Sequence, residues 1–314
     1  MIKFSKVSEK FKNEHLSRCR ELFDFIYNNK GHCANVLTGV ANANDLTMFL
    51  RDNFNTIVVG EPDSLREVIR EIELRFPDFY KYAYKRPRKT STRYDEHFAK
   101  LCVLVEELFD YDLFSDRNGV NGAYALVIAH NKRLCPYCHI NHINYHISQS
   151  KAGLTLRPAL DHYYPRGKYP YLGVSLYNLV PACHQCNSSI KGALDPLVDN
   201  VPHPCEEQPK ISIKFKCSSI LPAIDVQSMD DFTLSIEGID EGSQKFVELF
   251  KLVDRYSWHK PEVLDVYRKF QRYEDIDPEF KKVVRRTEFV LGFLTVDAPN
   301  RPLGHMLVDV ALCL

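Results

Sequence analysis

The sequence of 314 residues predicts an α+β fold in which a small, metal-stapled core lies between two mainly helical regions. Three observations lead to this prediction. Helical hydrophobic periodicity fills the first third of the chain, two C-x-x-C pairs follow, and short alternating segments precede a second helical part. We therefore divide the chain into a helical region 1–130, a core 131–200 and a C-terminal region 201–314 with short strands and helices.

Helices are expected throughout the first region. Leu16, Cys19, Phe23 and Ile26 recur at helical spacing, and Gly31 follows where a C-terminal cap belongs. Two further helices are predicted at about 62–76 and 94–109, because apolar residues form one stripe along each. The apolar run 123–129 is expected to be a buried helix that leads into the first cysteine pair.

The C-terminal region begins with a proline-rich connection at 195–204. Polar and apolar residues alternate at 211–216 and 232–237, which predicts two short strands. Helices are expected from about residue 244, near Pro261, and near Pro278, since proline is favoured at the first helical position.

Composition places the chain among ordinary folded proteins, because 45% of the residues are hydrophobic and 12% are aromatic. Lysine plus arginine equals aspartate plus glutamate at 41 each, so any electrostatic binding site must be local. No apolar run approaches the about 20 residues that span a bilayer, and the N-terminus lacks the apolar segment of a signal peptide. We therefore expect no membrane association and a cytoplasmic location.

The cysteines indicate a metal site. Cys135 and Cys138 form one C-x-x-C pair, and Cys183 and Cys186 form the other. Two such pairs in a reducing compartment favour a structural Zn²⁺ held by four thiolates. The six remaining cysteines follow no pairing pattern and are expected in the core.

Between the two pairs stand residues suited to phosphodiester hydrolysis. His162 has the intrinsic pKa of a general base that deprotonates water. Asp161 and Asn187 offer the oxygen ligands that Mg²⁺ or Mn²⁺ takes from a protein, and the Asn178 amide is suited to orienting the base. Because neighbouring residues on a strand point to opposite faces, a metal ligand beside the base predicts a bend in the backbone there.

These residues follow the order Asp-His-x-x-Pro, then Asn-Leu-Val-x-x-Cys-x-x-Cys-Asn and Lys-Gly, which resembles the HNH (ββα-metal) endonuclease motif. The resemblance implies a ββα-metal fold, His162 as general base, Asn178 as its support, and Asp161 with Asn187 on the catalytic metal. Many members add a four-cysteine zinc site. The chain departs from the pattern in the tyrosine-rich segment 169–171, and Lys191 falls one residue late.

Segments 246–250 and 255–263 are also similar to the helical tail of HNH proteins from Septu-type and retron-associated anti-phage defence systems. That similarity implies an ABC-type ATPase subunit as partner. For Arg255, Tyr256 and His259 in this segment, we expect helix packing and capping.

Basic residues near the motif are candidates for the nucleic-acid backbone. Arg166, Lys168 and Lys191 flank the proposed active site. The stretch 80–93 interleaves basic residues with tyrosines and is either a nucleic-acid contact or a solvated loop between helices. A group of three histidines, His139, His142 and His146, is expected on a surface loop.

Two other functions compete with the nuclease. One is a non-catalytic zinc-ribbon module that binds nucleic acid or protein. The other is an effector that is silent until it joins its ATPase complex, which the zero net charge favours. DNA is the favoured substrate, and RNA, including tRNA, is the alternative.

Overall fold

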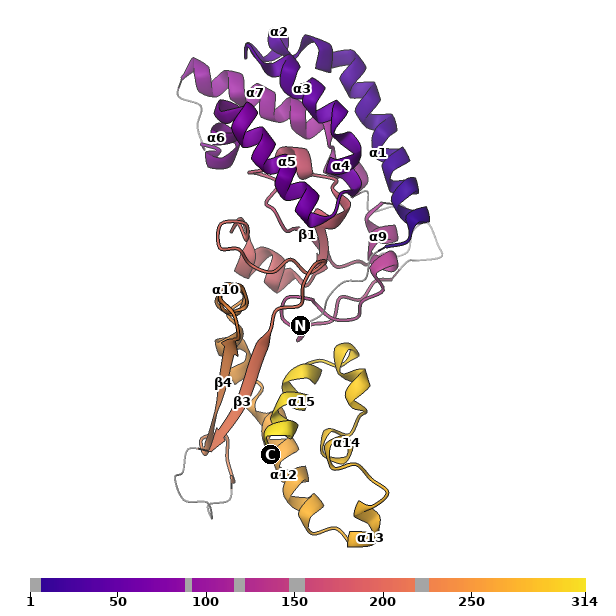
Figure 1. Ribbon diagram of the computed structural model, residues 1–314, viewed down its shortest axis with the longest axis vertical. Coiled ribbons are helices and arrows are strands. Elements are labelled where there is room, and N and C mark those ends of the chain that lie inside the picture. The colour runs from indigo at the N-terminus through magenta and orange to yellow at the C-terminus, as the bar shows by residue number, and fades with distance from the viewer. Residues whose placement is uncertain (1–6, 88–91, 116–121, 147–155, 218–225) are drawn as a thin grey trace.

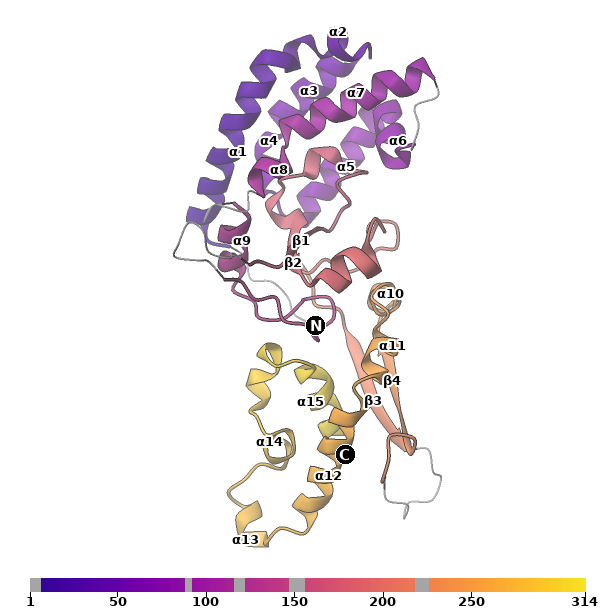
Figure 2. The ribbon, with the colours of Figure 1, turned by 180° about the vertical axis from the view of Figure 1, so that it is seen from behind.

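The computed structural model describes residues 7–87, 92–115, 122–146, 156–217 and 226–314. The molecule is elongated, with the N-terminal helices at one end, strands β1 and β2 near the middle, and the β3–β4 hairpin with the C-terminal helices at the other end (Figure 1). Figure 2 shows the same order from behind. Helices and two separate two-stranded sheets make up the described fold, so the α+β prediction is confirmed.

The first region is helical, as predicted. Its helices are α1 (Glu9–Lys30), α2 (Ala34–Thr38), α3 (Ala43–Asp52), α4 (Phe54–Val59), α5 (Pro62–Arg75), α6 (Pro77–Lys85), α7 (Arg93–Leu108), α8 (Tyr111–Phe114) and α9 (Ala123–His130), with a 3-10 turn at Gly31–Cys33. Phe23 is fully buried at its centre, with ring centroids 4.8 Å from Phe54 and 5.4 Å from Phe109. Gly31 follows α1, as predicted, and its N–H donates to the Tyr27 carbonyl; an added Cβ would lie 2.6 Å from the Tyr27 ring.

The core contains one antiparallel strand pair and a π-helix. Its elements are β1 (Ala159–His162), 3-10 turns at Pro170–Leu172 and Leu176–Asn178, β2 (Leu179–Ala182) and the π-helix Gln185–Lys191. In the strand pair, Asp161 lies opposite Val180 and His162 lies opposite Leu179. A loop of 16 residues, 163–178, therefore connects two strands that lie side by side.

That loop is held by the helical region. The His15 Nε2 atom of α1 lies 2.8 Å from the Val174 carbonyl oxygen. Arg66 of α5 donates to both carboxylate oxygens of Glu206, at 2.8 and 2.6 Å, and to the Tyr164 hydroxyl at 3.2 Å. The N-terminal helices thus form the support against which the loop is fixed.

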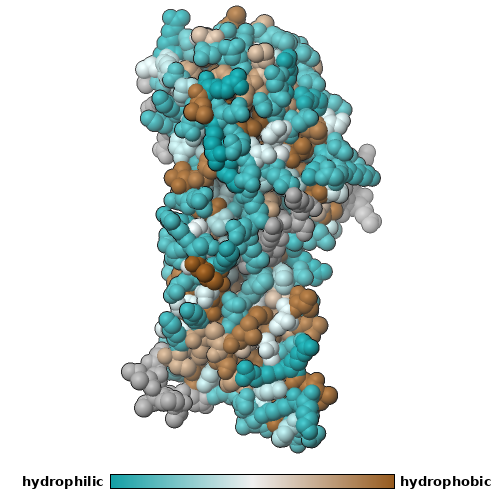
Figure 3. Space-filling model, viewed as in Figure 1, coloured by the Kyte–Doolittle hydropathy of each residue, from teal (hydrophilic) through white to brown (hydrophobic). Residues whose placement is uncertain are grey.

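The C-terminal region consists of a hairpin and helices. Its elements are β3 (Ile211–Cys217), β4 (Phe232–Gly238), α10 (Glu241–Leu249), α11 (Leu252–Ser257), α12 (Lys260–Glu274), α13 (Pro278–Lys281), α14 (Arg286–Leu291), a 3-10 turn at Thr295–Asn300 and α15 (Gly304–Cys313). Both predicted strands pair antiparallel, and Ile213 is buried opposite Ile236. On the face shown in Figure 3, apolar side chains gather over this region.

Two further expectations bear on the whole chain. None of the helices in the described ranges has the length and apolar character needed to cross a membrane. The expectation that the six remaining cysteines lie in the core is wrong for Cys33, Cys217 and Cys313, which are exposed.

Candidate active site and metal centre

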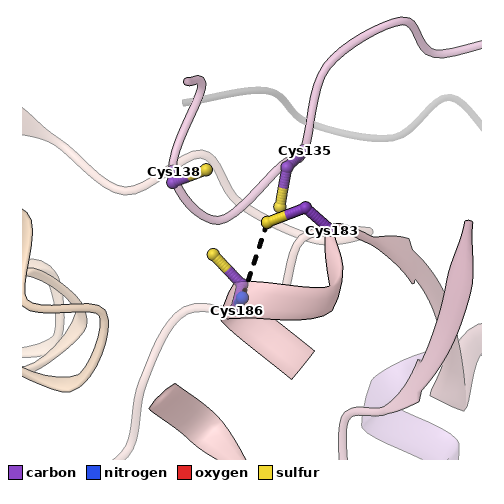
Figure 4. A group of neighbouring side chains, drawn as sticks. All are labelled: Cys135, Cys138, Cys183 and Cys186. Atoms are coloured by element: carbon purple, nitrogen blue, oxygen red, sulfur yellow. Dashed lines mark hydrogen bonds between the residues drawn. The ribbon is translucent and has the colours of Figure 1, made fainter. Parts of the chain in front are cut away.

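Four cysteines meet beside the strand pair. Cys135 and Cys138 come from the turn after α9, and Cys183 and Cys186 come from the end of β2 and the start of the π-helix (Figure 4). All four are buried, and their sulfur atoms lie within 4.8 Å of one another. Zn–S bonds of about 2.3 Å in a tetrahedron put the sulfurs about 3.8 Å apart, so a small contraction suffices to hold the ion.

Hydrogen-bond donors surround these sulfurs. The Asn141 amide nitrogen lies 3.4 Å from the Cys183 sulfur, and the Cys186 backbone nitrogen lies 3.5 Å from it. The Arg255 Nη1 atom lies 3.2 Å from the Cys186 sulfur. Burial works against the charged form of Arg255, but the sulfur charges outweigh burial and raise its pKa above the ordinary value.

The donor set fits zinc. Four buried sulfurs that accept from N–H donors match a closed structural site. The Arg255 guanidinium would offset the net negative charge of four thiolates around one Zn²⁺. The predicted grouping of the four cysteines is confirmed. Arg255 corrects one expectation, because it contacts the metal centre as well as packing in α11.

Asp161 lies on β1 and is buried, with both carboxylate oxygens in use. Its Oδ1 atom lies 3.1 Å from the Lys191 ammonium, and its Oδ2 atom accepts a 2.6 Å hydrogen bond from the Tyr137 hydroxyl. Burial raises the pKa of Asp161, while the Lys191 charge and the Tyr137 hydroxyl act in the opposite direction. Tyr137 stands inside the first cysteine pair, so the zinc centre and this carboxylate share one short segment.

Lys191 is the last residue of the π-helix. The Gly192 N–H donates to the Asn187 carbonyl at 2.9 Å, five residues back, and this wider turn absorbs the one residue by which Lys191 departs from the expected spacing. The Lys191 ammonium is fully buried and also donates to the His162 carbonyl oxygen at 2.8 Å. It does not face the surface, contrary to its predicted contact with substrate.

The predicted oxygen site for a catalytic cation is not open in this arrangement. The Lys191 ammonium and the Tyr137 hydroxyl occupy the Asp161 carboxylate. The Asn187 side chain is half-buried and makes no hydrogen bond to another residue in the described ranges. Asp161 as it stands therefore does not fit Mg²⁺ or Mn²⁺.

His162 is held in one tautomer. Its Nε2 atom lies 2.9 Å from the Gly173 carbonyl oxygen, and a carbonyl only accepts, so Nε2 carries the proton and Nδ1 keeps its lone pair. Burial lowers the pKa of His162 to about 4, although the Gly173 carbonyl acts in the opposite direction, so the ring is neutral at pH 7. The ring packs edge-on against Tyr111 at 4.5 Å.

Strand β1 runs through both Asp161 and His162. The Asp161 side chain contacts Lys191 and Tyr137. The His162 side chain contacts Gly173 and Tyr111, on the other face of the strand, as expected from strand alternation. The predicted bend between the two residues is therefore absent from β1.

Asn178 bridges the loop that carries the His162 partner. Its Oδ1 atom accepts from the Tyr164 N–H at 2.7 Å, and its Nδ2 atom donates to the carbonyls of Tyr164 and Leu172 at 3.1 and 3.2 Å. One buried amide thus ties the beginning of the loop to the residue before Gly173. This is the geometry expected of an orienting residue.

Arg166 and Lys168 face the helical region. Arg166 lies 3.5 Å from the Asp112 carboxylate, and Lys168 lies 3.9 Å from Asp195. Both are half-buried, and the Lys168 ammonium lies 4.3 Å from the centre of the Tyr84 ring. Each cation already has a carboxylate partner.

Two expectations about neighbouring segments are corrected. His139 is buried 4.7 Å from the His305 ring, and only His142 and His146 of the three histidines are exposed. The stretch 80–93 is helical as far as Lys85, and its residues 88–91 lie outside the described ranges.

Sequence reasoning missed Tyr137 and gave Tyr256 only a packing role. The Tyr256 hydroxyl donates to the Cys138 carbonyl at 2.9 Å. A tyrosine inside a C-x-x-C pair is a usable signal, because the cysteines on either side of Tyr137 cluster in the core and its ring is buried with them.

Comparison of the chain with protein-family models, with curated proteins and with solved structures finds no match. The functional argument therefore depends on the geometry of these residues and on the motif.

Proposed function

We propose that this chain is a metal-dependent HNH endonuclease that hydrolyses phosphodiester bonds of a nucleic acid, with DNA favoured and RNA as the alternative. The observation that carries the proposal is the state of His162, whose Nε2 proton is fixed on the Gly173 carbonyl. A neutral imidazole with a free Nδ1 lone pair is the form of histidine that accepts a proton from water.

Asn178 is the positioning residue for this base. It holds the loop backbone at Tyr164 and Leu172, and the next carbonyl after Leu172 belongs to Gly173. The hydrogen bond from His162 to Gly173 selects the tautomer of His162. Removing the Asn178 amide should therefore lower activity by loosening the position of the His162 ring. The side chain itself has no contact with Asp161 or Lys191 among the described hydrogen bonds.

The proposal includes a catalytic Mg²⁺ or Mn²⁺, which would supply positive charge at the scissile phosphate. We assign its ligands to Asp161 and Asn187 on the motif alone. Because Lys191 holds the Asp161 carboxylate, this assignment requires Lys191 to release it. Arg166 and Lys168 stay proposed as backbone contacts. The Arg166–Asp112 pair is exposed on both sides and exchanges at little cost, whereas Lys168 would have to leave the buried Asp195 carboxylate.

We also propose that the nuclease acts with an ABC-type ATPase subunit in an anti-phage defence complex. The support is the similarity of segments 246–250 and 255–263 to Septu-type and retron-associated proteins, together with the zero net charge.

A non-catalytic zinc module is the second candidate, and the Lys191–Asp161 pair is the observation that favours it. A permanent ammonium on Asp161 would leave no place for a catalytic cation.

One experiment separates the candidates. Zinc-loaded wild-type, His162→Ala and Asn178→Ala proteins would be incubated with duplex DNA, single-stranded DNA and structured RNA, with and without Mg²⁺. The exposed His146→Ala variant is the matched control. The nuclease proposal expects Mg²⁺-dependent cutting that falls about 10²- to 10⁴-fold in His162→Ala and is unchanged in the control. Binding without cutting, equal in all four proteins, would support the zinc module instead.

A further inference from the structure

The neutral net charge of the chain hides a strongly basic central segment. Between Arg117 and Leu194 the sequence has eight lysines and arginines and a single carboxylate, Asp161. Asp161 is buried against Lys191 and contributes nothing to the surface charge. Of the described cations of this segment, Arg166 and Lys168 pair with carboxylates and Lys191 is buried. Lys132, Arg133 and Arg157 make no ion pair among the described residues.

Two adjoining cavities open beside the cysteine cluster. One, of about 440 Å³, is lined by His142, Arg157 and His184 among others. The other, of about 650 Å³, is lined by Arg133, His142 and Arg301. His142 belongs to both walls, so the two cavities are parts of one groove, which we call the knuckle groove.

The arginines of the knuckle groove have no carboxylate partner within the described part of the chain. Arg133, Arg157 and Arg301 make no ion pair there, whereas Arg66 and Arg86 are each paired with a glutamate. Arg133 and Arg301 are exposed, and Asp297 is the only acidic residue among those that line the groove. Arg157 donates to the Pro158 and Ser115 carbonyls at 3.1 and 3.3 Å. Arg133 and Arg301 are therefore the two exposed guanidinium groups of the groove without a carboxylate partner among the described residues, and such groups attract an anionic ligand.

A nucleic-acid backbone fits these walls better than an acidic peptide does. Asn131, Asn144 and Asn300 line the groove with amide donors, which together with arginine are the usual contacts of phosphate and sugar oxygens. Next to Asn144, the Tyr145 ring is 42% exposed and offers a surface on which a base can stack.

The groove borders strand β1. Ala159 and Ala182, which pair at the open end of the β1–β2 ladder, line it. Because side chains alternate along a strand, Ala159 shares its face of β1 with Asp161, whereas the His162 side chain faces the other way.

We propose that the knuckle groove, with Arg133, His142 and Arg301 as its principal contacts, binds the phosphodiester backbone of a nucleic acid. This binding does not require the proposed nuclease activity.

The test is binding without cleavage. Fluorescence anisotropy of labelled duplex DNA, single-stranded DNA and an RNA hairpin would be measured in buffer without added divalent cations, over a series of salt concentrations. The Arg133→Ala/Arg301→Ala double variant is compared with wild type. Lys214→Ala/Lys216→Ala is the matched control, because it removes two exposed charges from β3, away from the groove.

Each lost phosphate contact lowers the slope of log K against log salt by about 0.9, so we expect a loss of about two in the groove variant. We also expect at least about tenfold weaker binding of the groove variant, with the control close to wild type. Equal binding by both double variants would overturn the proposal. Displacement of the nucleic acid by polyglutamate of equal charge would also overturn it, in favour of an acidic protein partner.

The same proteins separate this inference from the nuclease proposal. If the wild type binds through the groove and never cuts, the groove stands and the nuclease proposal fails. If the wild type cuts and the groove variant cuts with an unchanged KM, the nuclease proposal stands and the groove fails.

Discussion

Replacing Lys191 by methionine tests the most consequential contact of the core. The substitution gives an unbranched side chain one atom shorter and removes its charge and hydrogen bonds. In the native protein the ammonium lies 3.1 Å from Asp161 Oδ1 and 2.8 Å from the His162 carbonyl, and it is 0% exposed. The variant would leave the Asp161 carboxylate, itself 2% exposed, with Tyr137 as its only hydrogen-bond donor.

The expected loss of stability follows from burial. Removing one partner of a buried ion pair costs about 3–5 kcal/mol, because the remaining charge is neither solvated nor paired. A surface pair contributes only about 0–1 kcal/mol. The double variant Lys191→Met/Asp161→Asn leaves no buried charge, so it should be more stable than Lys191→Met alone.

The assay is urea unfolding of zinc-loaded protein, followed by circular dichroism of the helices. Lys282→Met is the control, because Lys282 and its partner Glu279 are 68% and 78% exposed. We expect it to lower the free energy of unfolding by about 1 kcal/mol or less. The prediction is refuted if Lys191→Met is as stable as Lys282→Met, or if the double variant is no more stable than Lys191→Met.

Three further predictions follow from the contacts described above. Cys183→Ser should lose zinc and lower the unfolding midpoint, because a structural metal contributes folding free energy directly; a zinc-replete, equally stable variant would contradict this. Arg255→Ala should weaken zinc binding about 10- to 100-fold in a chelator competition, since it removes the N–H donor 3.2 Å from the Cys186 sulfur, and unchanged affinity would make that contact incidental. Burial lowers the pKa of His15 to about 4 and that of His203 to about 3, below the unfolded value near 6.5. The unfolded chain therefore binds more protons than the folded chain below pH 6.5. The free energy of unfolding is highest above pH 6.5 and falls toward pH 4 by about 1.4 kcal/mol per pH unit for each ring. His203→Phe should make the urea midpoint depend less on pH.

The parts of the fold that depend on local patterns were predictable. The apolar stripes of α5 and α7 and the alternation in β3 and β4 located these elements to within about two residues. The four cysteines were predictable because spacing and chemistry both restrict C-x-x-C pairs in a reducing compartment.

The electrostatic detail of the core was not predictable in the same way. The position of Lys191 depends on the π-helix Gln185–Lys191. The late spacing of Lys191 in the sequence is compatible with a π-helix but does not by itself predict one. Its ammonium finds Asp161 across 30 residues of chain, a contact that no periodicity encodes. Arg255 reaches the Cys186 sulfur from 69 residues away, and only the packing of α11 against the zinc centre brings it there.

The shape of the knuckle groove was equally hidden. Arg133 and Arg301 are separated by most of the C-terminal half of the chain and line one cavity only in the folded protein. The excess of lysine and arginine over carboxylates before residue 194 can be read from the sequence. Which of these side chains are exposed cannot be read from it.

The most direct test of the central claim is the rate of duplex DNA cleavage by zinc-loaded wild type and His162→Ala, measured side by side with Mg²⁺ present. We predict cutting by the wild type and a loss of about 10²- to 10⁴-fold in the variant, with zinc content unchanged and the variant still folded by circular dichroism. Equal cleavage by the two proteins would contradict the assignment of His162 as the base.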